Sequence, residues 1–195
     1  MDKSDQELIL EYQGGNQEAL VALFERYKLP VFNFALRILG NRADAEDVTS
    51  EVMVILFSKK EAYVSMPGAK FSTWLYTVAR NTCISQIRRR KRTLSMWFSK
   101  SDSNEYEAWD VEDERELAHE EAAKREMAQK VRQAISGLPL NQKEALVLRE
   151  YQKLSYQEIS VVLDVSVDNV KVLIYRAREN LRGQLSAYIT EANNG

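Results

Sequence analysis

The stretch Leu154–Leu181, LSYQEISVVLDVSVDNVKVLIYRARENL, predicts two short helices joined by a tight turn. Ser155 and Glu158 have the spacing of an S-x-x-E capping box, so the first helix is expected to begin there. Residues 164–166, Asp-Val-Ser, supply the turn and a second cap. After this turn, apolar residues recur at helical spacing and are expected to form one buried stripe: Val170, Leu173, Ile174, Ala177 and Leu181.

The second helix carries a different set of residues on its other side. These side chains are mostly long, polar or cationic and are expected to face outward: Asp168, Asn169, Lys171, Val172, Tyr175, Arg176, Arg178 and Arg182. A helix with such a face suits the major groove of DNA, which predicts a helix-turn-helix. An ordinary helical hairpin with a solvated charged face explains this segment too, so the rest of the chain has to decide between the two.

The composition favours an all-helical protein. Of 195 residues, 45% are hydrophobic, so the chain can bury its core as one large domain or as two of roughly 70 to 100 residues. Three prolines, seven glycines and no long run that alternates apolar and polar residues argue against a sheet. The single cysteine excludes an internal disulfide and a multi-cysteine metal site. Because the sequence has no signal peptide and no run of about eighteen apolar residues, it predicts a cytoplasmic protein without membrane insertion.

The charge is distributed in three blocks. The whole chain has a net charge of −2, but residues 1–101 carry 15 basic and 11 acidic side chains, residues 102–126 carry 3 and 11, and residues 127–195 carry 9 and 7. Two mildly basic blocks therefore flank a strip with a net charge of −8. Because local patches set the attraction to phosphates, the small total charge does not exclude nucleic acid as a partner.

These patterns predict an all-α chain of two small helical domains joined by an acidic flexible linker. The first domain is expected over residues 1–95 and the second over residues 127–195. In the linker, residues 96–126, the apolar rhythm weakens and acidic residues dominate. A helix is expected to resume near Asp113, before the second domain begins.

Local signals mark the helices inside each domain. In the first domain, Gly14 and its neighbour stop a helix, Pro30 kinks or restarts the next helix, and residues 58–70 form a loop. In the second domain, Asn141 and Glu144 are expected to begin the helix that precedes the helix-turn-helix. No internal repeat is evident.

The sequence contains no convincing catalytic set. A hydrolase or transferase needs a nucleophile with a base, a metal cluster or a glycine loop that holds phosphates. The only histidine, His119, lies in the acidic linker, and Gly14-Gly15 has no accompanying Lys-Ser/Thr pair. We therefore expect neither an enzyme nor a cofactor, a metal or a small-molecule substrate.

Aromatic and basic residues occur together at the end of the first domain. Four aromatic residues, Tyr63, Phe71, Trp74 and Tyr76, precede a polar and basic group that comprises Arg80, Asn81, Gln86 and the run Arg88, Arg89, Arg90, Lys91 and Arg92. Such a combination can hold unstacked bases and the adjoining backbone of a single strand. The alternative is that Phe71, Trp74 and Leu75 are core residues, and we expect this for Trp74 and Leu75.

Taken together, these residues resemble the extracytoplasmic-function (ECF) sigma factors, a compact class of bacterial RNA polymerase sigma subunits. In the first domain the resemblance lies in three segments: Asp44 to Val52 (DAEDVTSEV), Phe71 to Asn81 (FSTWLYTVARN) and Arg88 to Arg90. In the second domain it lies in four: Leu138-Pro139, Leu154 to Ile159 (LSYQEI), Val170-Lys171 and Tyr175 to Leu181 (YRARENL). The order and spacing of these pieces cover nearly the whole chain.

The resemblance implies three sets of contact residues. The set implied to bind the coiled coil of the polymerase's largest subunit is Asp44, Glu46, Asp47, Glu51 and Val52. The set implied to melt and hold the minus-ten element is Tyr63, Lys70, Phe71, Trp74, Arg80, Asn81, Arg88, Arg89, Arg90, Lys91 and Arg92. The set implied to bind the minus-thirty-five element is Ser155, Ser166, Asp168, Asn169, Lys171, Val172, Tyr175, Arg176 and Arg178.

The partners that follow from the resemblance are core RNA polymerase and promoter DNA. The polymerase contacts would lie on the clamp coiled coil of the largest subunit and on the flap region, and the acidic linker would follow the basic RNA exit path. Families of this type usually have an anti-sigma factor as a further partner.

Four residues depart from the usual family pattern. Asp164 stands where Gly is usual, Val172-Leu173 stands where Ser-Arg is frequent, and Ser50 replaces a frequent Gln. An outward Val172 can contact a thymine methyl group but cannot donate a hydrogen bond. The preferred minus-thirty-five sequence is therefore expected to differ from that of relatives with Ser-Arg.

Two other classes of protein remain as alternatives. A helix-turn-helix regulator that acts without being a polymerase subunit explains the last 70 residues but not the segment from Trp74 to Arg92. An adaptor that binds only protein predicts no effect on DNA.

Overall fold

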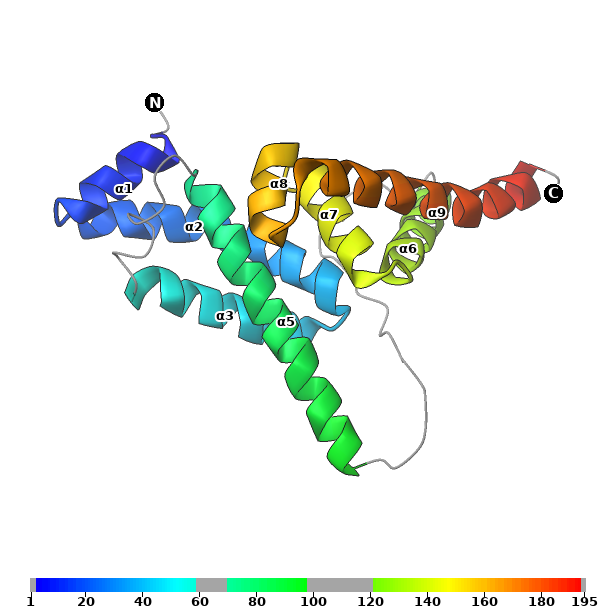
Figure 1. Cartoon of the computed structure of the whole chain (residues 1–195), viewed down its shortest axis with the longest axis horizontal. Coiled ribbons are helices and arrows are strands. Elements are labelled where there is room, and N and C mark those ends of the chain that lie inside the picture. The colour runs from blue at the N-terminus through cyan, green and yellow to red at the C-terminus, as the bar shows by residue number, and fades with distance from the viewer. Residues whose placement is uncertain (1–2, 59–69, 98–120, 194–195) are drawn as a thin grey trace.

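The computed structural model describes residues 3–58, 70–97 and 121–193, and every regular element in these ranges is a helix (Figure 1). The elements are α1 (Asp5–Gln13), α2 (Gln17–Leu39), α3 (Arg42–Ser58), α5 (Phe71–Trp97), α6 (Glu121–Ser136), α7 (Leu140–Glu150), α8 (Tyr156–Leu163) and α9 (Val167–Asn193). The all-α prediction is confirmed for this part of the chain.

Helices α1, α2, α3 and α5 pack into the N-terminal domain around a core of fully buried side chains, with Phe34 and Leu75 among the largest. Pro30 lies inside α2, which runs without interruption from Gln17 to Leu39, so the proline does not restart the helix. Ser4 begins α1 with a capping box to Glu7, and Asn16 caps α2. Local sequence signals therefore place the starts of these two helices.

Helices α6 to α9 form the C-terminal domain, in which α7 packs against α9 and α8. Ser155 caps α8 as predicted, because its hydroxyl accepts a hydrogen bond from the Glu158 N–H and its own N–H donates to the Glu158 carboxylate. Asp164 ends α8 in the left-handed conformation at φ 55°. This conformation is easiest for glycine, and aspartate is one of the few other residues that adopt it.

Some predicted boundaries differ from the structure. Helix α5 continues to Trp97 and α6 begins at Glu121, so the linker expected over 96–126 is helical at both ends. The helix expected near Asp113 lies outside the described residues. Helix α7 begins at Leu140 after Pro139 rather than at an Asn141 cap, because the Asn141 side chain accepts only the N–H of the next residue.

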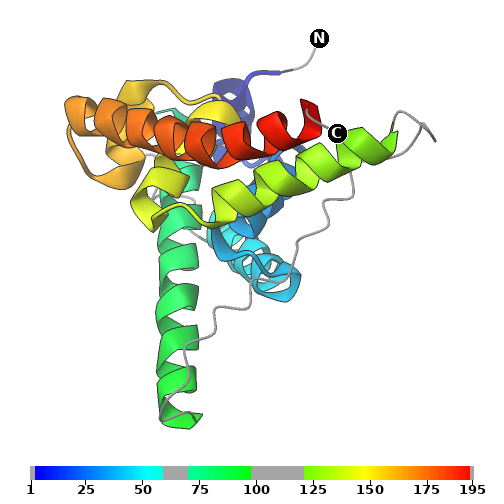
Figure 2. The same cartoon turned by 90° about the vertical axis from the view of Figure 1, so that its right-hand side faces the viewer.

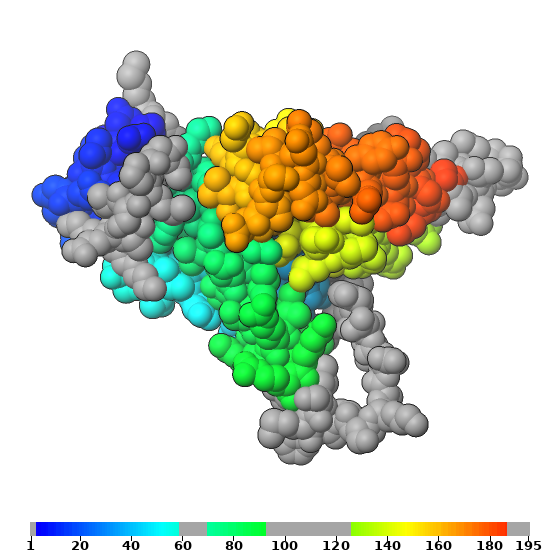
Figure 3. Space-filling view, in the orientation of Figure 1, coloured from blue at the N-terminus to red at the C-terminus, as the bar shows by residue number. Residues whose placement is uncertain are grey.

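The two domains lie directly against one another. Helix α8 packs on the first half of α5, and α7 packs on α2, so the buried residues form one continuous core cluster. The space-filling view shows α8 seated on α5 (Figure 3). The second half of α5 instead extends away from the other helices, as two perpendicular views show (Figures 1 and 2).

Lys143 is a buried cation in α7 and leads to a prediction about stability. Its side chain is only 3% exposed, and its ammonium donates to the Ser136 carbonyl at 2.7 Å. Burial lowers the pKa of Lys143 from 10.5 to about 8. The folded protein therefore releases this proton more easily than the unfolded chain, so this lysine's contribution to the free energy of unfolding increases as the pH rises from 8 toward 10.5.

We expect the difference in unfolding free energy between the wild-type protein and Lys143→Met to change by about 1 to 2 kcal/mol between pH 8 and pH 9.5, in favour of the wild type at the higher pH. Urea unfolding of both proteins at the two pH values measures this difference, and the subtraction cancels the other titrating groups. A difference that stays constant with pH would show that Lys143 holds its ordinary proton affinity.

Candidate nucleic-acid and polymerase interfaces

Helix α9 presents the predicted outward residues to solvent. Its inner stripe is buried, with Val170 and Ala177 at 0% exposure, while Val172 is 43% and Tyr175 is 65% exposed on the outer side. All nine residues of the minus-thirty-five set are exposed: Ser155, Ser166, Asp168, Asn169, Lys171, Val172, Tyr175, Arg176 and Arg178. Ser166 also caps α9, since its hydroxyl accepts the Asn169 N–H at 3.2 Å. The C-terminal domain therefore holds a helix-turn-helix whose second helix has a free polar face.

Carboxylates neighbour several cations on this face. Lys171 pairs with Asp168 at 2.9 Å, and Arg178 pairs with Glu150 of α7 at 2.6 Å. The hydrogen bond to the Glu150 carboxylate holds the pKa of Arg178 above its ordinary value. Exposed pairs of this kind add little stability, so they orient the cations at small cost.

Helix α3 carries the acidic residues of the set that the resemblance implies for polymerase binding. Glu46, Asp47 and Glu51 are exposed along it. Val52 is not part of this face, because its side chain is 0% exposed within the core. Its assignment as a polymerase contact is corrected to a core residue.

Asp44 has a structural role in addition to its place on the acidic helix. Its carboxylate accepts a hydrogen bond from the Gln86 amide at 2.8 Å and lies 3.6 Å from the Arg90 guanidinium, and both partners belong to α5. The Asp44 N–H donates to Asn41, which caps α3. Asp44 therefore ties the start of α3 to the basic end of α5, and only 21% of its side chain remains exposed.

The aromatic residues at the start of α5 belong to the core. Phe71 is 2% and Trp74 6% exposed, and the Phe71 ring packs against the rings of Tyr27 and Trp74 at centroid distances of 5.3 and 5.7 Å. The core interpretation of Trp74 and Leu75 is confirmed, and the assignment of Phe71 as a direct DNA contact is corrected on the same ground. Tyr63 lies outside the described residues.

A shallow groove runs between α3 and α5 and joins residues of two predicted sets. It is lined by Glu51, Ile55, Trp74, Val78, Asn81, Thr82 and Ser85. Glu51 belongs to the predicted polymerase set, whereas Asn81 and the edge of Trp74 belong to the minus-ten set. The two sets therefore meet on one surface of the N-terminal domain.

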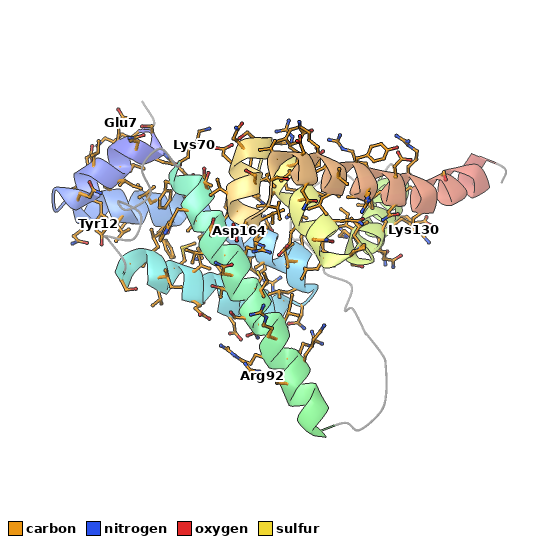
Figure 4. All side chains as sticks on the ribbon, viewed as in Figure 1. Glu7, Tyr12, Lys70, Arg92, Lys130 and Asp164 are labelled. Atoms are coloured by element: carbon orange, nitrogen blue, oxygen red, sulfur yellow. The ribbon has the colours of Figure 1, made fainter. Side chains whose placement is uncertain are left out.

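The basic run occupies the part of α5 that extends from the body of the protein. Arg88, Arg89, Arg90, Lys91 and Arg92 are all exposed, and Figure 4 shows Arg92 on this extension. Lys70 lies at the opposite end of α5, beside α8, with 76% of its side chain exposed (Figure 4). Cations are thus present at both ends of the same helix.

Sequence reasoning missed the contacts that join the two domains. Arg80 of α5 pairs with Glu144 of α7, and Arg37 of α2 lies with its guanidinium 3.9 Å from the centre of the Tyr151 ring. Glu144 had only a helix-start pattern to mark it, and a local pattern gives no sign of a partner 64 residues away. In residues 3–58, 70–97 and 121–193 no group of three or more His, Cys, Asp or Glu side chains could hold a metal ion, and no helix there could cross a membrane.

Comparison with known proteins accounts for both domains. The Sigma-70 region 2 family profile matches residues 23–93, and the Sigma-70 region 4 profile matches residues 128–181. The ECF RNA polymerase sigma factor SigW of Bacillus subtilis is 30% identical over 182 residues, which cover 91% of this chain and 94% of that protein. The chain belongs to the ECF RNA polymerase sigma factors.

Other sigma factors align over a similar length. The sigma-H factor of Pseudomonas aeruginosa is 28% identical, with 97% of this chain and 98% of that protein covered. The ECF sigma-E factor of Escherichia coli is 28% identical, with coverages of 95% and 96%. As a sigma factor the chain acts with RNA polymerase to initiate transcription, and a regulator that is not a polymerase subunit is not favoured, because region 2 accounts for the segment from Trp74 to Arg92.

Two solved structures share the fold. CnrH, in complex with the cytosolic domain of CnrY, superposes with a TM-score of 0.67 at 23% identity, with 95% of this chain and 99% of that chain covered. The sigma factor RpoE of Bartonella quintana, in complex with the anti-sigma factor NepR, gives a TM-score of 0.64 at 21% identity, with coverages of 84% and 94%.

The contacts of Asp44 lead to a prediction that separates a structural role from a contact role. We expect Asp44→Ala to lower the free energy of unfolding by about 1 kcal/mol, because it removes the hydrogen bond from Gln86. Asp47→Ala, at an exposed position on the same helix, is the matched control and is expected to stay within about 0.5 kcal/mol of the wild type. Urea denaturation followed by circular dichroism measures both. Equal stability of the two variants would show that Asp44 does not stabilise the fold.

Proposed function

We propose that this sigma factor binds core RNA polymerase and opens promoters through a division of labour between its two domains. In this proposal, residues 1–95 bind the polymerase and the minus-ten element, residues 96–126 link the domains, and residues 127–195 bind the minus-thirty-five element. The observation that carries the proposal is the combination of an exposed polar face on α9 with an exposed cationic run on α5 in a chain that matches both sigma regions.

The α9 face would read duplex DNA in the major groove. Arg176 is exposed and can donate two hydrogen bonds to a guanine, while Val172 and Tyr175 offer apolar contact to a thymine methyl group. Lys171 and Arg178 would contact phosphates, which fix the register of the helix without reading sequence. Ser155 and Ser166 lie at the starts of α8 and α9, where helix N-termini also favour a phosphate.

The α5 helix would hold the opened strand. Lys70, Arg80 and Asn81 are assigned to the non-template strand near the minus-ten element, and Arg88 to Arg92 to its phosphates. Phe71 and Trp74 support this surface from the core rather than stacking directly on bases, since both are buried. The free energies of duplex binding by one domain and of single-strand binding by the other then add, so neither site needs high affinity by itself.

The acidic face of α3 would contact the polymerase. Glu46, Asp47 and Glu51 suit a basic surface such as the coiled coil of the largest subunit, and like charges on the sigma factor would repel DNA from this face. We also propose that the C-terminal domain contacts the flap region of the polymerase. We also infer a cytoplasmic location and no catalytic activity of its own.

An anti-sigma factor is a further proposed partner. The similar structures of CnrH and RpoE are complexes, the first with the cytosolic domain of CnrY and the second with the anti-sigma factor NepR. A partner of that class for this chain is supported by the shared fold.

The proposal is tested by adding the purified chain to sigma-free core polymerase and measuring start-site-specific transcripts from a promoter library. We expect transcripts with the wild-type chain and a loss of at least about tenfold with Asp47→Lys, because a reversed charge on α3 opposes a basic partner. Glu18→Lys, the same change at an exposed position of α2, is the matched control. Activity of Asp47→Lys equal to this control would contradict the assignment of α3.

Removing charge from the extended end of α5 is expected to weaken promoter complexes and to flatten their dependence on salt. Arg88→Ala with Lys91→Ala should reduce the slope of log affinity against log salt concentration by about 1.4 to 1.8, because each phosphate contact contributes about 0.7 to 0.9. Lys28→Ala in α2 is the control with no assigned DNA contact. Fluorescence titrations of holoenzyme with promoter DNA at several salt concentrations measure the slope, and an unchanged slope would rule out these two contacts.

A further inference from the structure

Helix α5 turns one polar face toward the C-terminal domain. Tyr76, Arg80 and Cys83 are four and three residues apart, so they lie on the same side of this helix. The Tyr76 hydroxyl donates to the Gln152 side chain at 2.5 Å, and the Arg80 guanidinium donates to the Glu144 carboxylate at 3.1 Å. Both acceptors lie in or just after α7, so this helix and the turn that follows it cover the face.

Glu144 is held in this interface at an energetic cost. Its side chain is 2% exposed, and burial raises the pKa of its carboxyl group, an effect that the nearby Arg80 partly opposes. Arg80 is 21% exposed and therefore less desolvated than its partner. A carboxylate buried in this way needs a cation beside it, because an unpaired buried charge is strongly unfavourable. The domain contact thus depends on Arg80 remaining with Glu144.

Two further cations of the N-terminal domain bind the same side of the C-terminal domain. Lys70 lies 3.0 Å from the Glu158 carboxylate, which also closes the capping box of α8. Arg37 lies over the ring of Tyr151, which ends α7. Lys70 and Arg80 are the two residues among these that the proposed function assigns to the opened promoter strand.

We propose that the C-terminal domain is an internal competitor of the promoter strand, whose carboxylates at Glu144 and Glu158 occupy the cations Arg80 and Lys70 in place of DNA phosphates. The inference rests on the proposed function of these two cations. In the closed arrangement the α7 and α8 side of the C-terminal domain covers the first half of α5, while the basic extension and the α9 face stay exposed (Figures 3 and 4). Arg80, which is 21% exposed, becomes available to DNA only when the domains separate, whereas Lys70 is 76% exposed and is held by its ion pair with Glu158.

The competition lowers the affinity of the free chain for single-stranded DNA. When only a fraction of molecules is open, the apparent dissociation constant rises by the inverse of that fraction. A polymerase that holds the two domains apart removes this penalty, so strand binding is coupled to assembly with the enzyme. The free chain is thereby kept from binding single strands elsewhere.

The test compares the free chain with the holoenzyme for binding to a fluorescent single strand taken from a promoter that the holoenzyme selects. Glu144→Lys opposes Arg80 with a like charge and should open the domains. Glu179→Lys, the same change at a partly exposed position of α9, is the matched control for added positive charge. We expect the free Glu144→Lys chain to bind the strand roughly fivefold or more tightly than the control, and the two holoenzymes to bind it equally.

A second variant that separates the domains, together with an independent measurement of separation, shows whether misfolding of Glu144→Lys causes the effect. Tyr151→Ala with Gln152→Ala removes two contacts at the surface of the interface and should produce the same gain, with an unchanged helical circular dichroism spectrum. Cys83, the single cysteine of the chain, is 0% exposed, and burial together with the nearby Glu144 raises the pKa of its thiol. We therefore expect faster labelling of Cys83 by a thiol reagent in both opening variants than in the control.

The outcomes separate this inference from the proposed function. Faster labelling without tighter strand binding, or no change in either, would overturn the inference while the holoenzyme still binds. Adding Arg80→Ala to the Glu144→Lys chain should abolish the gain, and a gain that persists would also overturn it. Failure of the wild-type holoenzyme to bind its selected strand would instead contradict the proposed function of α5.

Discussion

Helix α5 contacts three different environments along its 27 residues: the core, the C-terminal domain and solvent. The other helices are arranged around it. One side supplies Phe71, Trp74 and Leu75 to the core formed with α2 and α3. A second side presents Tyr76 and Arg80 to the C-terminal domain. The far end extends beyond both domains with its basic run in solvent. A single rigid helix therefore links core packing, domain contact and the proposed strand-binding surface.

Much of this arrangement was predictable because it is encoded in local patterns. The capping box at Ser155 and the apolar stripe of α9 depend on residues three or four positions apart, and the structure confirms them. The family resemblance, built on the order of such segments, is confirmed by the matched sigma regions. Local signals were sufficient wherever a helix is defined by its own residues.

The rest depends on partners that are distant in sequence. Asp44 has the pattern of a solvated acidic residue, yet it binds Gln86 and Arg90 of another helix. Phe71 lies beside cations, which suggested a stacking role, but the ring of Tyr27 completes a pocket that buries it. Glu144 resembles a helix-start residue and instead pairs with Arg80 across the domain contact. In each case three-dimensional proximity, which one sequence does not reveal, decides the role of the side chain.

The division of labour between the two domains is best tested by mapping both promoter elements in one complex of the purified chain with core polymerase. We expect permanganate-reactive thymines near the minus-ten element, which report an opened strand, together with protection of intact duplex near the minus-thirty-five element. Arg176→Ala should remove the upstream protection, and loss of charge at Arg88 to Arg92 should reduce the downstream opening. A two-fold symmetric footprint made by the chain alone, with no opened thymines when polymerase is present, would show that the two domains do not share the work in this way.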